Sequence, residues 1–127
     1  MMKNILPYVV IGLAIAYFIY NKRSAASNGI SAQMLRSKLK TDANIGLIDV
    51  RSESEYNGSV GHVKGSKLVP LPELSSRLDE IKSQNYDEVY VICLSGSRSA
   101  SAVKTLSKNG IDAQNVIGGM MAWNKLK

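Results

Sequence analysis

A lone cysteine, Cys93, stands where an apolar segment gives way to small, flexible residues. The five residues before it, 88–92, are mostly β-branched, aromatic or aliphatic, which favours a strand. Residues 93–98 read Cys-Leu-Ser-Gly-Ser-Arg and are typical of a turn that leads into a helix. Gly96 can adopt a positive φ, so this turn can point successive backbone N–H groups inward.

A ring of inward N–H groups at the positive end of a helix stabilises an anion, here the sulfur of Cys93. We expect it to lower the pKa of the thiol below the ordinary value of about 8.5. Arg98 adds a permanent positive charge at the far end of the turn. The alternative is that Cys93 is a buried apolar residue, the common fate of a lone cysteine. The small residues, the arginine and the helix together favour a reactive Cys93 over a buried apolar one.

The elements that must position this turn alternate between strands and helices. That order indicates an α/β fold with a central parallel sheet covered by helices on both faces. In such a sheet, ligands bind at the carboxyl ends of strands, which is where Cys93 stands. The expected strands are 46–50, 67–69, 88–92 and 115–117. The expected helices are 31–40, 52–56, 73–83, 98–109 and 120–125.

Length and composition narrow the class of protein. The chain has 127 residues, 45% of them hydrophobic, which fits one ordinary globular domain. It has one cysteine and one histidine, so neither an intramolecular disulfide nor the usual zinc cluster is expected. The net charge is +6, but three of the cations flank an apolar segment near the amino terminus, and the rest carries only +3. Nucleic acid is therefore not an expected partner.

The amino-terminal segment predicts a membrane anchor. Ile5–Tyr20 contains no charged residue, and Lys22 and Arg23 follow it. We therefore divide the chain into an anchor with its basic flank at 1–23, a linker at 24–29 and a domain at 30–127. The cations after the apolar run place the domain on the cytoplasmic side of a single-pass membrane protein. The alternative is a cleaved signal, which would make the domain secreted or periplasmic.

Several short motifs follow one another along the chain: Leu47–Arg51, Glu55-Tyr56, Gly61–Ser66, Val69–Leu71, Cys93–Ser99 and Gly118–Trp123. With these motifs, the chain from about Ile30 to Lys127 resembles a single-domain rhodanese. The matches to the family pattern occur independently and in the expected order, which makes the resemblance specific. The rhodanese-like fold that the resemblance implies agrees with the predicted α/β alternation.

The resemblance implies a sulfurtransferase in which Cys93 is the catalytic residue. The cysteine would take a sulfane sulfur from a donor, a persulfide or thiosulfate, and pass it from its own persulfide to a thiol or cyanide acceptor. A low-pKa thiolate suits this covalent scheme, which requires neither cofactor nor metal. The persulfide- and substrate-binding residues would be the rest of the turn: Leu94, Ser95, Gly96, Ser97 and Arg98. For Arg98, a structural bond to backbone carbonyls or to an acid is an equal alternative.

Three further residues of the family pattern are expected to support the site. Asp49 and Arg51 follow a strand end near the pocket. A structural role, in which they satisfy loop backbone groups and pair with Glu55 or another carboxylate, is favoured over substrate contact. His62, between two residues of a glycine-rich loop, is expected to hydrogen bond within that loop rather than act as a base. Met120 and Trp123 are expected to pack or to form the pocket wall.

Loop length and one departure from the family refine the prediction. The related phosphatases have one more residue between cysteine and arginine, so the Cys-x4-Arg spacing makes phosphatase activity the weaker enzyme hypothesis. Thiosulfate-using relatives often have a polar or basic residue directly after the cysteine, where this chain has Leu94. We therefore expect thiosulfate to be a poor donor and a persulfide to be the better one.

The alternative from a different class is a non-catalytic rhodanese-like module that recruits a protein partner to the lipid bilayer. Inactive family members usually lack the cysteine, so the presence of Cys93 in a well-formed turn favours the enzyme.

Overall fold

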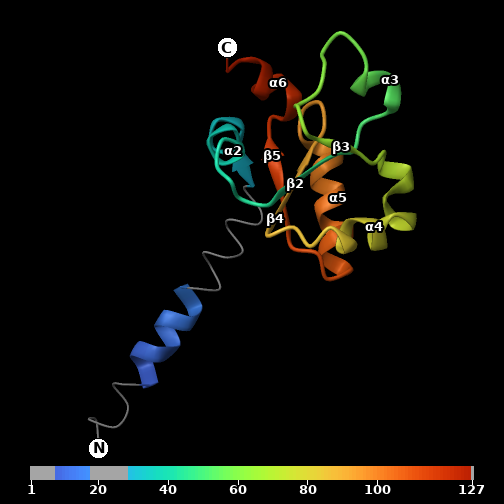
Figure 1. Cartoon of the computed structure of the whole chain (residues 1–127). Helices are drawn as coiled ribbons and strands as arrows, with labels where there is room; N and C mark the ends of the chain where they lie inside the picture. The colour runs from blue at the N-terminus through green and yellow to red at the C-terminus, as the bar shows by residue number, and fades with distance from the viewer. Residues whose placement is uncertain (1–7, 18–28, 127) are drawn as a thin grey trace, which may run out of the picture.

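The strands of the chain form one parallel sheet in the computed structural model, which describes residues 8–17 and 29–126 (Figure 1). The strand order is β1-β5-β4-β2-β3, and every pairing is parallel. In the central pair, Ile48 of β2 lies opposite Val91 of β4. The strands are β1 Ile30–Ser31, β2 Ile45–Asp49, β3 Lys67–Leu68, β4 Glu88–Ile92 and β5 Ala113–Ile117. Their carboxyl ends therefore lie along one edge.

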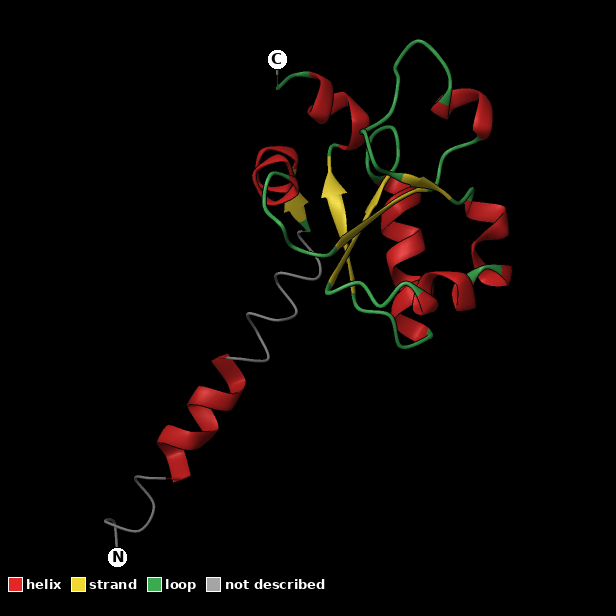
Figure 2. Cartoon of the chain, viewed as in Figure 1, coloured by secondary structure: helices red, strands yellow, loops and turns green. Residues whose placement is uncertain are grey.

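Helices alternate with the strands and cover both faces of the sheet, as Figure 2 shows. They are α2 Ala32–Leu39, α3 Glu53–Tyr56, the 3-10 helix η1 Leu71–Ser76, α4 Leu78–Ser83, α5 Ser97–Lys108 and α6 Gly119–Asn124. Helices α4, α5 and η1 pack on one face, and α2 and α6 on the other. The predicted α/β fold, with a parallel sheet between two helical layers, is confirmed.

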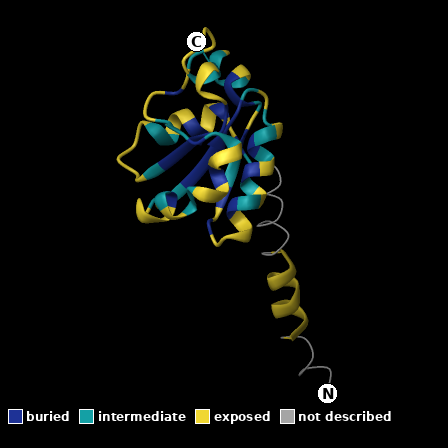
Figure 3. Cartoon of the chain, turned by 90° about the vertical axis from the view of Figure 1, so that its right-hand side faces the viewer, coloured by how far each residue is buried: buried dark blue, intermediate teal, exposed yellow. Residues whose placement is uncertain are grey.

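Each face of the sheet has its own apolar cluster, and the strands are the most buried part of the chain (Figure 3). The first cluster joins alternate residues of β2 and β4 to the apolar side of α5, including Ala102 and Leu106. Cys93 belongs to this cluster, so its side chain lies on the α5 side of the sheet. The second cluster joins Leu35 of α2 and Met120 of α6 to the opposite face.

The region after β3 differs from the prediction of one helix over 73–83. It begins as η1, in which the N–H of Glu73 donates to the carbonyl of Pro70 at 2.8 Å. Pro72 has no N–H to donate, and Arg77 has φ −116° and ψ 15°, outside the α region, so α4 starts anew at Leu78. The two-residue strand β1 was not predicted; it is too short to show alternation.

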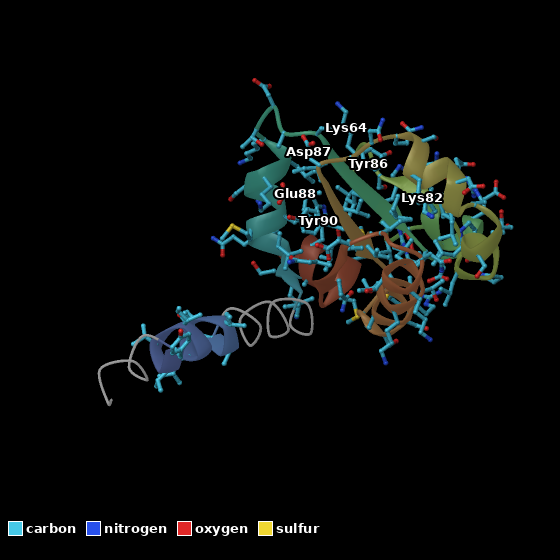
Figure 4. All side chains as sticks on the ribbon, turned by 90° about the horizontal axis from the view of Figure 1, so that it is seen from below. Lys64, Lys82, Tyr86, Asp87, Glu88 and Tyr90 are labelled. Atoms are coloured by element: carbon cyan, nitrogen blue, oxygen red, sulfur yellow. The ribbon has the colours of Figure 1, made fainter. Side chains whose placement is uncertain are left out.

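A polar contact ties α2 to the start of β4. Lys38 Nζ donates to Glu88 Oε1 at 2.8 Å, and the hydroxyl of Tyr90 donates to the same oxygen at 2.8 Å. The hydrogen bond from Lys38 lowers the pKa of the Glu88 carboxyl. Figure 4 shows Glu88 and Tyr90 beside α2 in the view from below. These groups lie at the amino end of the sheet, the edge opposite Cys93.

Residues 8–17 form a helix with exposed side chains, drawn in blue in Figure 1. The predicted anchor at 1–23 and the linker at 24–29 otherwise lie almost wholly outside the described residues. Over 8–17 and 29–126, none of the helices has both the length and the hydrophobicity needed to cross a bilayer.

Candidate active site

Cys93 directly follows β4 at the carboxyl edge of the sheet, and the chain turns there into α5. Gly96 makes the turn with φ +115°, a conformation that favours glycine, and is the N-cap of α5. The helix starts at Ser97, one residue earlier than predicted. Arg98 consequently lies in the first helical turn, and the backbone N–H groups at the start of α5 lie beside the sulfur.

The sulfur of Cys93 is surrounded by donors. The N–H of Gly96 donates to Sγ at 3.0 Å, and the Oγ of Ser99 lies 3.2 Å from Sγ. Backbone N–H groups of Ser95 and Ser99 stabilise the same atom. Cys93 is only 1% exposed, and Ser99 is fully buried. The sulfur is thus buried, but the N–H groups point at it, which satisfies the geometric condition for an anion site.

Two opposing effects set the pKa of the Cys93 thiol. Burial raises it, and this is the largest single effect. The hydrogen bond from the Ser99 hydroxyl and the N–H groups of Ser99, Gly96 and Ser95 lower it, and together they prevail. The net pKa lies below the ordinary value, in the direction predicted from the turn, so the thiolate is more populated than in an ordinary cysteine.

Helix α6 holds the turn from behind. The N–H of Met120 donates to the carbonyl of Cys93 at 2.8 Å, and that of Met121 donates to the carbonyl of Leu94 at 3.1 Å. Gly119 has φ +54°, and a Cβ there would overlap both of those carbonyl oxygens. A glycine is therefore required where α6 meets the turn.

Arg98 is bound to an acid, one of the alternatives left open by the sequence. Its Nη1 and Nη2 donate to the two oxygens of Glu55 at 2.7 and 2.8 Å. Glu55 also belongs to a capping box with Ser52, the N-cap of α3. The guanidinium, helped by the Ser52 hydrogen bonds, lowers the pKa of the Glu55 carboxyl to about 2 against the effect of burial. The charge of Arg98 is thus neutralised within the chain.

Asp49 and Arg51 form a second, buried ion pair, with 0% and 1% exposure. Arg51 Nη2 donates to Asp49 Oδ2 at 2.7 Å and to the carbonyl of Gly61 at 2.9 Å. The pair ties the end of β2 to the loop after α3. None of its hydrogen bonds reaches Cys93, so its described contacts are those of a loop-holding pair.

His62 is exposed and lies within the same loop. Its ring stacks on Tyr56 with centroids 3.7 Å apart, and Nδ1 lies 2.8 Å from the carbonyl oxygen of Tyr56. These contacts hold the loop, and no hydrogen bond described for His62 reaches the cysteine.

A pocket of about 310 Å³ opens beside the turn. Leu94, which is half-buried, and Val60 form its apolar wall. Arg51 and Glu55 also line it, each engaged in an ion pair. Met120 and the half-buried Trp123 pack in the cluster behind Leu94. Of the turn residues 93–98, Leu94 alone lines this pocket, which thus lies beside the turn.

Of the predicted turn residues 94–98, Ser95 and Gly96 donate backbone N–H groups to the sulfur of Cys93. Arg98 binds Glu55 instead, and the hydrogen bond described for His62 is to Tyr56. Sequence reasoning missed Ser99, Asn115 and the pairing partner of Arg98. Asn115 of β5 contacts Ser99 through its side-chain oxygen and donates to the carbonyl of Gly96 at 3.2 Å. Ser99 had one usable signal, because it lies beside Arg98 in the first turn of the helix that follows Cys93.

Comparison with known proteins gives consistent results. The chain matches the Rhodanese-like domain over residues 31–126. It is 36% identical over 95 residues to "Putative sulfur carrier protein YrkF" of Bacillus subtilis, covering 74% of this chain but 49% of that protein. The chain thus spans about half the length of that relative.

Two other similar proteins are matched over most of their length. One is "Putative sulfurtransferase YtwF" of Bacillus subtilis, 37% identical over 95 residues, with 74% of this chain and 87% of that protein covered. The other is the crystal structure of a rhodanese-like domain protein from Staphylococcus aureus, 36% identical with a TM-score of 0.63, covering 74% of this chain and 88% of that one. The fold, the cysteine turn and these matches agree: the chain belongs to the rhodanese-like domain family.

Proposed function

We propose that the protein is a sulfurtransferase that carries sulfane sulfur on Cys93. The observation that carries this proposal is the sulfur of Cys93 at the carboxyl end of β4, with the Gly96 N–H at 3.0 Å and the Ser99 hydroxyl at 3.2 Å. These donors favour the thiolate, which is the attacking form of a cysteine. The described relatives named as a sulfur carrier and a sulfurtransferase support the same assignment.

The chemistry has two steps. The Cys93 thiolate attacks the outer sulfur of a donor, the donor's S–S bond breaks, and its electron pair leaves with the donor thiolate. The acceptor then attacks the outer sulfur of the Cys93 persulfide, and the electron pair of that S–S bond returns to Sγ. The same donors that stabilise the attacking thiolate stabilise the thiolate that leaves in the second step.

The preferred donor is a persulfide rather than thiosulfate. A dianion needs a free cation near the cysteine, but Arg98 is bound to Glu55 and Arg51 is bound to Asp49. Leu94 supplies an apolar side chain to the pocket beside the turn. A persulfide, whether of a small thiol or of a protein partner, is not a dianion. It can therefore contact the apolar wall of this pocket without a free cation in the protein.

Mass spectrometry of the full chain tests the proposal. After incubation with a persulfide donor, we expect a gain of the mass of one sulfur atom on Cys93, which is the only cysteine. The gain should disappear in Cys93→Ser, remain in Ser101→Ala, an exposed serine of α5, and be lost on addition of a thiol acceptor. Absence of the gain with every donor class would refute sulfur transfer and favour a binding module.

We also propose that residues 1–23 tether the domain to the membrane with the domain on the cytoplasmic side. The uncharged run Ile5–Tyr20 and the cations at Lys22 and Arg23 support this. A fluorescent protein that matures only in the cytoplasm, fused after Lys127, should give fluorescence in the membrane fraction. Fluorescence in the soluble fraction would contradict the tether. Absence of fluorescence would contradict the cytoplasmic orientation of the domain.

A further inference from the structure

The hydroxyl of Ser99 has three polar neighbours but only one proton. Its Oγ lies 3.2 Å from Cys93 Sγ and 3.1 Å from the carbonyl oxygen of Gly96, and it also contacts Oδ1 of Asn115. Ser99 is fully buried, so bulk water does not supply a further partner. The direction of this one O–H bond decides which neighbour receives the proton.

The Gly96 carbonyl already has its donors. The N–H of Ala100 donates to it at 3.1 Å, and Nδ2 of Asn115 donates to it at 3.2 Å. A carbonyl oxygen has two lone pairs, so these donors satisfy it. The bond to Gly96 also fixes the amide of Asn115 with its Oδ1 toward Ser99. Asn115 Oδ1 is therefore the acceptor that competes with the sulfur for the hydroxyl proton.

The sulfur requires that proton only when it is an anion. A protonated Cys93 donates its own S–H to Oγ, and the hydroxyl then donates onward to Asn115. A thiolate can only accept, so the hydroxyl must turn away from Asn115 to stabilise it. In a persulfide, Sγ is bonded to the outer sulfur and carries no full charge. The Ser99 hydroxyl therefore donates to Asn115 Oδ1 again.

We propose that the Ser99 hydroxyl is a donor with two positions and that Asn115 is the positioning residue that holds it away from Cys93 until Sγ becomes an anion. When an acceptor takes the outer sulfur, the electron pair of the breaking S–S bond stays on Sγ and the hydroxyl turns to it. The turning of the hydroxyl during sulfur transfer rests on the proposed function. The competition between Asn115 Oδ1 and Cys93 Sγ for the hydroxyl proton also exists when Cys93 carries no extra sulfur.

The ion pairs at this edge of the sheet are Arg98–Glu55 and Arg51–Asp49, and the loop after α3 adds the exposed His62 and Lys64. Of these, Arg98 interacts electrostatically with Cys93 from α5. Strand β5 and helix α6 contain no charged residue. A neutral replacement of Asn115 therefore changes no charge around the sulfur, and its effect reports on the hydroxyl.

The pH profile of alkylation of the full chain by iodoacetamide tests the proposal, because Cys93 is the only cysteine and the thiolate is the reacting form. We expect the profile of Ser99→Ala to move to higher pH and that of Asn115→Leu to move to lower pH. The double variant should match Ser99→Ala, because Asn115 acts through the hydroxyl. Gln114→Leu, which also replaces an amide by leucine one residue away in β5, should leave the profile in place.

Sulfur transfer provides a second readout. Transfer from loaded Cys93 to a thiol should slow by about tenfold or more in Ser99→Ala, since a hydrogen bond to a charged group is lost. A profile of Asn115→Leu that stays in place or moves to higher pH would overturn the proposal, as would additive shifts in the double variant. Because alkylation requires no sulfur donor, this result is separable from failure of the proposed function.

A second variant controls for the lost bond to Gly96. Asn115→Asp loses the donor to the Gly96 carbonyl, as Asn115→Leu does, but makes the acceptor of the hydroxyl proton stronger. It should move the alkylation profile to higher pH, and the movement should be smaller when Ser99 is replaced by alanine. Equal movement in both backgrounds would mean that the carboxylate acts on the sulfur directly, and the proposal would fail.

Discussion

The ion pair between Glu55 and Arg98 keeps a cation from anionic donors, so its removal should improve the use of thiosulfate. The substitution is Glu55→Gln. A glutamine retains the capping-box hydrogen bond to the Ser52 backbone, so α3 should persist. The guanidinium of Arg98, now without its carboxylate, becomes available beside the pocket that Leu94 and Glu55 line.

The size of the effect follows from the exposure of the pair. The two side chains are 39% and 33% exposed, so the dielectric constant of water applies. A dianion about 5 Å from the freed guanidinium gains about 1.7 kcal/mol, which salt at physiological strength reduces to about 1 kcal/mol. That energy corresponds to about a fivefold rise in kcat/KM for thiosulfate.

The assay compares kcat/KM for thiosulfate and for an uncharged organic trisulfide at low and high salt. Glu55→Gln should raise the value for thiosulfate only, and the rise should shrink as salt is added. Glu53→Gln, an exposed carboxylate of the same helix, is the matched control. An unchanged or lower value for thiosulfate, or an equal gain in the control, would refute the reasoning.

Three further predictions concern the surrounding structure. Asp49→Ala leaves the buried Arg51 without its carboxylate and should reduce the free energy of unfolding by about 3–5 kcal/mol, measured with urea; a loss below about 1 kcal/mol would contradict the buried pair. Gly119→Ala should lower both Tm and sulfur loading, whereas Gly110→Ala, also at positive φ but with open space around it, should lower Tm alone; equal loading in the two would argue against α6 as the support of the turn. The pKa of the Glu55 carboxyl is lowered from 4.5 to about 2, so its ion pair stabilises the fold above about pH 4.5 and is lost as the pH falls toward 2. Stability of Glu55→Gln should therefore fall less over that range, and equal losses would contradict the assignment.

The parts of the fold that could be predicted are those with local signals. Strand β4 occupies the predicted residues 88–92, because a β-branched and aromatic run identifies a buried strand. Helix α5 lies within one residue of its prediction at both ends, since glycines stand before and after it at 96 and 110. The reactive turn between them was predictable for the same reason.

The parts that could not be predicted depend on contacts between distant residues. Glu55 and Arg98 are 43 residues apart, and Ser99 and Asn115 are 16 apart. Nothing in the types of these residues selects one partner over another, which is why two roles for Arg98 stayed open. Only the packing of α3 and β5 against the turn decides the pairs.

The parallel direction of all the strands has a consequence for how the protein can be held in the cell. Ile30 of β1 lies opposite Val116 of β5, and Val91 of β4 lies opposite Asn115. The chain therefore enters the domain level with the end of β4, two strands and roughly 10 Å to the side of it. An attachment through the leading segment thus reaches the domain at the same edge of the sheet as Cys93. A bulky donor or acceptor then has its free approach on the opposite flank, over β2 and α3, where the pocket beside Leu94 lies.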